Sequence, residues 1–251
     1  INLSYWSTIC YLYFNSEAQM ITLNNIVIGF DKDLFAVDRV GFHKGKVHVL
    51  TGKNGIGKSA FLRTLSGLLK PLQGEISLDD KALDKYSDRE LSTHISFVPS
   101  SQKGVSFLSV DAYLMLGRSN FTNMFGNASE EDLKAVEKAK SIFGITHLSH
   151  KHTNQISSGE LQLCAIAKAY VQETDYILLD EPTAHLDYQN KKRVYEILKQ
   201  ISIDQNKGII ISTHDLDLAF KFPFNFYLIK ESDLKLHEIE GFNDIENEFN
   251  S

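Results

Sequence analysis

Short apolar runs alternate along the chain with longer stretches in which apolar residues recur every three or four positions. The short runs, bounded by Gly, Pro or Asp, predict β-strands. Tyr176–Leu179 and Gly208–Thr213 have unbroken apolar cores, which is typical of strands buried on both faces of a parallel sheet. The remaining predicted strands cover 21–28, 35–40, 46–50, 74–80, 95–98 and parts of 224–240.

Helical periodicity marks the stretches between these strands. One predicted helix begins at about Lys58 and ends near Leu69, where Pro71 stops it. Another covers Ser129–Phe143, with Ser129 as its N-cap and Gly144 beyond its end. Its predicted apolar stripe consists of Leu133, Val136, Ala139, Ile142 and Phe143. Further helices are predicted over 108–116 and 190–201, so the pattern indicates an α/β fold with a helical insert at about 103–155.

Composition sets broad limits on this picture. The 251 residues suffice for one large α/β domain or two smaller ones, and 43% hydrophobic with 23% charged residues is ordinary for a soluble globular protein. The net charge of −6 and the scattered Lys and Arg argue against a nucleic-acid partner. No apolar run reaches the roughly 18 residues of a membrane span. Cys10 and Cys164 lack metal-binding spacing, which indicates a reducing compartment, and Cys164 is expected to be buried.

Residues 1–19 differ in character from the rest of the chain. They begin without Met and are rich in Tyr, Phe and Leu, yet they lack the basic start of a signal peptide. Tyr11–Ser16, followed by Met20, resembles a protease-cleavable tag before a native start; an authentic N-terminal strand is the alternative. The folded domain is therefore expected to span 20–251.

The stretch Gly52–Ser59 fits the pattern G-x-x-x-x-G-K-[ST] between a predicted strand and a predicted helix. Its three glycines let consecutive backbone N–H groups point inward, and the new helix adds its positive N-terminal end. Lys58 is then expected to reach the β- and γ-phosphates of a nucleotide, and the Ser59 hydroxyl to ligate Mg²⁺. The alternative is an ordinary glycine turn that contains Lys-Ser.

Charged residues follow the two most apolar strands. Asp180, at the carboxyl end of the first, is expected to bind Mg²⁺ directly or through water, and Glu181 to accept a proton from an attacking water. His214, at the same edge, is expected to contact the γ-phosphate. The alternative for the acids is solvated side chains at a strand end. Phe30 is expected either to stack on adenine at the mouth of the loop or to pack in the core.

Three histidines, His147, His150 and His152, follow the predicted insert. Their spacing is not a standard ligand pattern and no nearby acid or cysteine completes one, so a solvated linker is favoured over a metal site.

Several motifs together resemble those of ABC-type ATPases over about residues 21–240. Besides the phosphate loop these are Ile156–Glu160, Asp180–Pro182, Ala184–Asp187 and Ser212–Asp215, in the order and spacing of that family. The resemblance implies a P-loop NTPase fold with a mostly parallel central sheet, an antiparallel β subdomain and a helical insert.

The resemblance also implies a role for each motif. Ile156–Glu160 is similar to the LSGGQ signature, in which Ser158, Gly159 and the following helix form a second phosphate site that acts in trans. Two subunits would face head to tail, with Asp187 in the D-loop at their interface and His214 as the switch histidine. The expected nucleotide contacts are Phe30, Gly52, Asn54, Gly55, Gly57, Lys58, Ser59, Ala60, Ser157, Ser158, Gly159, Glu160 and Asp187.

Some positions depart from the family pattern. Ser158 replaces the usual Gly and Glu160 the usual Gln, while Ala60 replaces a second hydroxyl. The usual Gln after Pro99 is Ser100 here, so either Gln102 reaches in from a shifted loop or that Mg²⁺ ligand is water. The expected metal set is Ser59, Asp180 and Gln102, and the expected catalytic set is Lys58, Glu181 and His214.

The tetrad Ala184–Asp187, the motif Leu116–Arg118 and the length of the insert resemble ATPases of iron-siderophore, haem or cobalamin importers. That resemblance implies an ATPase that uses ATP and Mg²⁺, forms a homodimer, and docks on an integral-membrane permease through residues 98–118. It would work indirectly with a substrate-binding protein, at the cytoplasmic face of the cell membrane. The alternatives are a soluble ABC ATPase without a permease and a nucleotide-dependent regulatory module.

Overall fold

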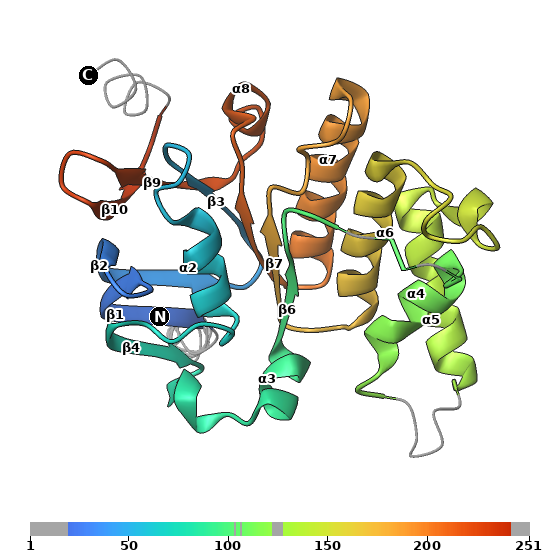
Figure 1. The fold of residues 1–251 in the computed structure, drawn as a ribbon, viewed down its shortest axis with the longest axis horizontal. Coiled ribbons are helices and arrows are strands. Elements are labelled where there is room, and N and C mark those ends of the chain that lie inside the picture. Colours follow the sequence, from blue (N-terminus) through green and yellow to red (C-terminus); the bar gives the residue numbers. More distant parts are fainter. Residues whose placement is uncertain (1–19, 103, 106, 122–127, 242–251) are drawn as a thin grey trace, which may run out of the picture.

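A computed structural model describes residues 20–102, 104–105, 107–121 and 128–241. These residues build one ten-stranded mixed sheet with helices on both faces, in the order β5-β4-β1-β2-β10-β9-β3-β8-β7-β6 (Figure 1). The strands are β1 (Met20–Gly29), β2 (Asp33–His43), β3 (Val47–Thr51), β4 (Gln73–Leu78), β5 (Lys81–Ala82), β6 (Ile95–Val98), β7 (Tyr176–Asp180), β8 (Gly208–Ser212), β9 (Asn225–Lys230) and β10 (Lys235–Ile239).

The helices divide between the strands. The α-helices are α2 (Lys58–Leu65), α3 (Asp88–His94), α4 (Val110–Met115), α5 (Glu130–Phe143), α6 (Ser158–Val171), α7 (Tyr188–Asp204) and α8 (Leu216–Ala219). Short 3-10 turns are η1 (Leu83–Lys85), η2 (Leu116–Arg118) and η3 (Thr146–Leu148).

The sheet has a parallel and an antiparallel part. β6, β7, β8, β3 and β9 pair in parallel, and the unbroken apolar runs of β7 and β8 are fully buried as predicted. β1, β2, β4 and β5 pair antiparallel, and a single bridge from Lys235 to Ala36 joins β10 to β2. The predicted α/β fold with a mostly parallel central sheet and an antiparallel part is confirmed.

Two hydrophobic clusters lie on opposite faces of the parallel strands, because successive side chains of a strand point to opposite sides. Tyr176 and Leu178 of β7 belong to the cluster that contains Phe61 of α2. Ile177 and Leu179 belong to the cluster built with α6 and α7. The phosphate-loop helix α2 and helix α6 therefore cover different faces of the sheet, as their separation by β7 in Figure 1 also shows.

Some predicted helix limits were wrong. α2 ends at Leu65 rather than Leu69, because Gly67 adopts a left-handed φ of 77° and the N–H groups of Leu68 and Leu69 turn back to the Arg63 carbonyl. α4 is shorter than predicted and continues as η2. α5 begins and ends as predicted, with Ser129 and Gly144 as caps. Within the predicted apolar stripe Val136, Ala139 and Phe143 are buried, whereas Leu133 is 53% exposed.

Between β6 and β7 the chain forms the predicted helical region. Gly117 lets η2 approach α6 closely, since a Cβ there would lie 2.4 Å from the Lys168 carbonyl oxygen. The next residue, Arg118, is buried and donates to Asp132 of α5 at 2.8 Å. The Leu116–Arg118 motif thus has a structural basis in this chain.

Among the described residues, no helix combines the length and apolar character of a membrane span. Residues 1–19, with Cys10, lie outside the described residues.

Candidate active site

The parallel strands bring three chain segments to one edge of the sheet. β3 pairs with β8, and β8 with β7, so that Leu50 and Asp180 both lie in register with Ser212. The phosphate loop follows β3, Asp180 ends β7 with Glu181 directly after it, and His214 follows β8. Because parallel strands end at the same edge, these sequence motifs meet there.

The glycines of the phosphate loop adopt the conformations that the sequence predicts. Gly52, Gly55 and Gly57 have φ values of 150°, 80° and 114°, which residues other than glycine rarely adopt. Gly57 is the N-cap of α2, and a Cβ there would lie 3.1 Å from side-chain atoms of Leu34 and Phe35. The loop therefore leads directly into the N-terminus of α2. A glycine loop followed by a helix N-terminus is an arrangement that favours anions.

Lys58 lies inside this loop with 6% of its surface exposed. Its Nζ donates to the carbonyl oxygens of Gly52 at 2.8 Å and Lys53 at 3.1 Å. Burial lowers the pKa of this ammonium, while the nearby carboxylates of Glu181 and Asp180 act in the opposite direction. The fold thus places the phosphate-loop lysine beside the acidic pair.

Asp180 and Glu181 are connected through Ser212. The Ser212 hydroxyl donates to Asp180 Oδ1 at 2.7 Å, and the Glu181 backbone N–H donates to Ser212 Oγ at 2.9 Å. Glu181 has a φ of 48°, and its Oε1 lies 3.1 Å from His214 Nε2. Asp180 is 2% exposed whereas Glu181 and His214 are partly exposed. The chain therefore holds a buried carboxylate next to an accessible Glu–His pair.

Two residues of the signature segment, Ser157 and Glu160, have a structural role at the start of α6. Ser157 caps α6, and Glu160 completes a capping box: its Oε2 accepts from the Ser157 N–H and hydroxyl at 2.8 and 2.9 Å. Glu160 Oε1 also lies 3.7 Å from His147 Nε2. Ser158 and Gly159 occupy the first turn of α6. A nucleotide role for these four residues stays a prediction.

Other predicted site residues take varied positions. Phe30 is 57% exposed, so packing in the core is wrong for this side chain. Gln102 Nε2 donates to the Pro99 carbonyl at 2.7 Å. Asp187 caps α7 by accepting from the Asn190 N–H at 2.9 Å. Ser59 is exposed on the first turn of α2, while Ala60 is buried. Within the described residues no cluster of three or more His, Cys, Asp or Glu is arranged to hold a metal.

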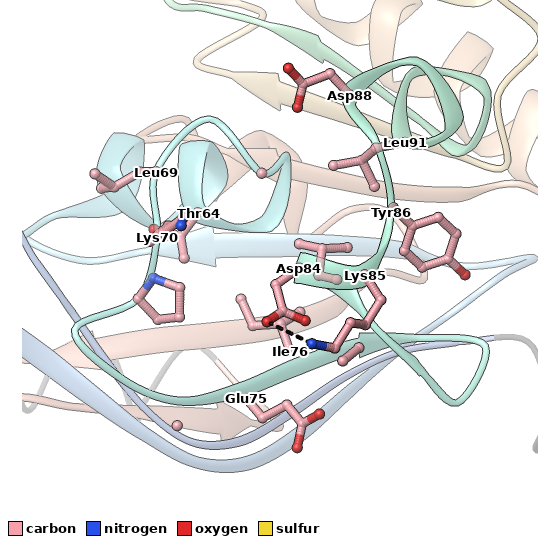
Figure 2. Close-up of a pocket in the computed structure, with 15 residues that line it drawn as sticks. Thr64, Leu69, Lys70, Glu75, Ile76, Asp84, Lys85, Tyr86, Asp88 and Leu91 are labelled. Carbon is pink, nitrogen blue, oxygen red and sulfur yellow. Dashed lines mark ion pairs between the residues drawn. The ribbon is translucent and has the colours of Figure 1, made fainter.

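Sequence reasoning placed Asp215 with His214 at this edge, but it missed Ser212 as the bridge between the acids, and missed Thr183 and Lys191 as the partners of Asp215. A hydroxyl residue at the end of an otherwise apolar strand was the available signal for Ser212. A cavity of about 680 Å³ lies between the end of α2, β4 and α3. Its lining residues include Leu69, Ile76 and Leu91 (Figure 2). None of the predicted nucleotide contacts lines that cavity, so the residues gathered at the sheet edge define the candidate site.

A phosphate loop between strand and helix, with a lysine beside two carboxylates at the carboxyl edge of a parallel sheet, defines a P-loop nucleoside triphosphatase. Within that class, residues 38–184 match the family described as ABC transporter. The chain belongs to this family, whose members bind and hydrolyse ATP.

Two relatives illustrate the similarity. An uncharacterised ABC transporter ATP-binding protein of Haemophilus influenzae is 35% identical over 217 residues, covering 86% of this chain and 82% of the relative. YusV of Bacillus subtilis, described as a probable siderophore transport system ATP-binding protein, is 32% identical over 188 residues, covering 75% and 68%.

Solved structures agree in fold. An ABC transporter assigned to the metal-chelate type, in an inward-facing conformation, has a TM-score of 0.76 with 27% identity, covering 92% of this chain and 89% of the other. The cassette MJ0796, solved as a dimer, has a TM-score of 0.77 with 23% identity, covering 89% and 100%, and thus shows the fold.

Proposed function

We propose that this chain is the ATP-hydrolysing subunit of an ABC importer whose cargo is a metal chelate such as an iron-siderophore, haem or cobalamin. The observation that carries the proposal is the gathering of Lys58, Asp180, Glu181 and His214 at one sheet edge. The descriptions of the relative YusV and of the metal-chelate type transporter support the cargo class.

ATP is proposed to bind with its phosphates in the loop Gly52–Ser59. The backbone amides and the N-terminus of α2 supply partial positive charge, and Lys58 exchanges its two carbonyl partners for the β- and γ-phosphates. The exposed side chain of Phe30 can stack on the base. Catalysis then rests on positioning and charge stabilisation of the transferred phosphoryl group.

The residues at the edge fit Mg²⁺, because this cation takes hard oxygen ligands. Ser59 offers an exposed hydroxyl, and Asp180 offers a buried carboxylate whose Oδ1 is oriented by Ser212. When bound, the ion would neutralise charge on the phosphates. Gln102 is proposed as a third ligand through its amide oxygen, because its Nε2 donates to the Pro99 carbonyl.

Glu181 is proposed to take a proton from the attacking water, with His214 orienting this carboxylate and contacting the γ-phosphate. The 3.1 Å separation of the two side chains and their partial exposure support this assignment. Asp180 is buried whereas Glu181 is partly exposed, so the two carboxylates are proposed to have separate roles: Asp180 binds the metal and Glu181 accepts the proton.

A homodimer is proposed to complete the site. α2 and α6 lie on different faces of the sheet, so one chain cannot easily close its own phosphate loop with Ser158 and Gly159. Those two residues of a second copy would instead cover the γ-phosphate, with Asp187 nearby at the interface. ATP binding would close the dimer, and hydrolysis would reopen it.

Residues 98–118 are proposed to dock on the permease at the cytoplasmic face of the membrane. In this segment the apolar side chains of Val105, Phe107 and Leu116 are 49%, 90% and 53% exposed. Interaction surfaces are typically apolar where they are exposed, and these three side chains supply apolar area in the segment proposed to dock. Movement of this surface on dimer closure would transmit the conformational change to the permease. A substrate-binding protein would act on the permease from the other side of the membrane.

Substitution Glu181→Gln tests the catalytic assignment. The variant should bind ATP, accumulate a closed dimer in size-exclusion chromatography with ATP, and lose turnover, because the amide cannot accept the proton. Glu131→Gln on the exposed surface of α5 is the matched control and should behave as the parent. Unchanged turnover in Glu181→Gln would remove that residue from the base role.

Co-purification followed by an ATPase assay tests the transport assignment. A polytopic membrane protein that co-purifies with the chain and raises its ATPase rate would support the importer. Stimulation by RNA or DNA in place of a membrane protein would contradict it.

A further inference from the structure

Asp215 directly follows the predicted switch histidine, His214. Its Oδ2 accepts from the Thr183 hydroxyl at 2.6 Å, and its Oδ1 accepts from Lys191 Nζ at 2.6 Å. Asp215 is also the N-cap of α8, where an Asp side chain ordinarily accepts from a helix N–H. In the described part of the chain this side chain makes no such cap bond, so both carboxylate oxygens are used to hold neighbouring segments.

The two donors come from different parts of the chain. Thr183 lies two residues after Glu181, in the loop that follows β7. Lys191 lies in the first turn of α7, where its N–H donates to the carbonyl of Asp187, the cap of that helix. Asp215 therefore ties the segment that carries His214 to the loop that carries Glu181 and to the beginning of α7.

The residue on the other side of His214 is also held. The Asp215 N–H donates to Thr213 Oγ1 at 3.0 Å, and this hydroxyl is 2.9 Å from the Tyr195 hydroxyl of α7. Thr183 and Thr213 are each 1% exposed, and Tyr195 is fully buried. His214 is thus the side chain of 213–215 that faces outward, with its backbone anchored on both sides.

We propose that Asp215 is a positioning residue for ATP hydrolysis: through Thr183 and Lys191 it sets the separation of Glu181 and His214. This role rests on the proposed function, because it acts through the pair assigned to catalysis there. The link to Lys191 makes the separation depend on the first turn of α7 and on Asp187, the residue proposed to meet the second subunit. Charge-assisted hydrogen bonds at 2.6 Å are strong enough to hold such a geometry.

The proposal predicts that loss of Asp215 lowers the rate of ATP turnover while leaving ATP binding nearly unchanged. Among the described residues, the hydrogen bonds and ion pair of the Asp215 side chain involve Thr183 and Lys191 and no residue of the phosphate loop. Asp215→Ala should therefore leave the KM for ATP within about twofold, while kcat falls by about 10- to 100-fold, the size of effect that misplacing reacting groups produces. Asp215→Asn, which keeps the shape and one acceptor oxygen, should lose less.

A matched control is Asp217→Asn, because Asp217 is exposed on the neighbouring helix α8. This variant should keep both constants of the parent. Thr183→Val removes one of the two bonds with little change of shape and should lower kcat to an intermediate value. Thermal unfolding of every variant identifies loss of folding, and Thr183→Val carries the test if Asp215→Ala does not fold.

A double-mutant cycle with His214→Ala decides between positioning and a general structural role. If Asp215 acts through His214, then Asp215→Ala should cost almost nothing further in kcat once His214 has been removed. Losses that multiply, or a kcat for Asp215→Ala equal to that of the parent, would overturn the proposal. A parent protein without ATPase activity would instead contradict the proposed function, so the two failures are distinguishable.

Discussion

His48 is the second residue of β3, which lies between β8 and β9, and its side chain has no exposed surface. Its ring contacts Phe42 edge-on, with centroids 5.1 Å apart, and Tyr227 at 5.8 Å. Nε2 lies 3.0 Å from the His43 carbonyl oxygen, to which it donates, whereas Nδ1 has no hydrogen-bond partner among the described residues. A second proton on Nδ1 would therefore be buried without an acceptor.

Burial lowers the pKa of His48 from 6.5 to about 4, and the hydrogen bond to His43 only partly opposes this. Between these two values the unfolded chain binds more protons than the folded one, so the contribution to stability is complete above pH 6.5 and is lost as the pH falls toward 4. At 1.36 kcal/mol for each pKa unit, the full difference is about 3 kcal/mol. Between pH 7.5 and pH 5 the free energy of unfolding should fall by about 2 kcal/mol from this residue alone.

Urea denaturation at pH 7.5 and pH 5 measures this contribution when the wild type is compared with His48→Leu. The variant loses the hydrogen bond to His43, so it starts from a lower stability at pH 7.5, by about 1 kcal/mol. Its decrease between the two pH values should nevertheless be about 2 kcal/mol smaller than that of the wild type.

His150→Leu serves as the control, because it removes an exposed imidazole by the same substitution. It should keep the pH dependence of the wild type. If His48→Leu also keeps that dependence, the reasoning from burial and the missing acceptor is refuted.

Three further predictions concern stability and reactivity. Arg118→Met leaves the buried Asp132 without its ion-pair partner and should lower the free energy of unfolding by about 3–5 kcal/mol in urea denaturation; no loss would contradict the pairing. Gly74→Ala places a Cβ 2.2 Å from the Asn25 carbonyl oxygen at a φ of 82°, so it should cost at least about 1–3 kcal/mol by the same assay, and equal stability would refute the conflict. In a Cys10→Ser variant, Cys164 should resist thiol reagents at pH 8 until the protein unfolds, because burial raises its pKa to about 12; rapid labelling of the native protein would disagree.

Much of the candidate site could be predicted because its signals are local. The phosphate loop needs glycines at positions with positive φ and a helix directly afterwards, so eight consecutive residues define it. The apolar runs of β7 and β8 predicted buried parallel strands, and strands of that kind end at one edge. The acidic pair and His214 could therefore be assigned to the same place from the sequence.

Other features were missed, some of them despite a local signal. The helix was predicted to end near Pro71, but the positive φ of Gly67, which was not considered, ends it at Leu65. The exposure of Phe30 and Leu133, in contrast, depends on what packs against them. The capping box of Ser157 and Glu160 has a local signal, since Glu follows Ser by three residues at the start of a helix, but it was not among the predictions.

The sequence by itself determined most of the strands, the longer helices, the phosphate loop and the chemistry available at the sheet edge, because periodicity, caps and glycine conformations act over a few residues. Only the tertiary structure decided the strand order, the placement of α2 and α6 on different faces, and the bridges made by Ser212 and Asp215. The bonds from Ser212 to Asp180 and from Thr183 to Asp215 each join residues 32 positions apart. Their partners are selected by the pairing of strands and the packing of helices, which no short stretch of sequence specifies.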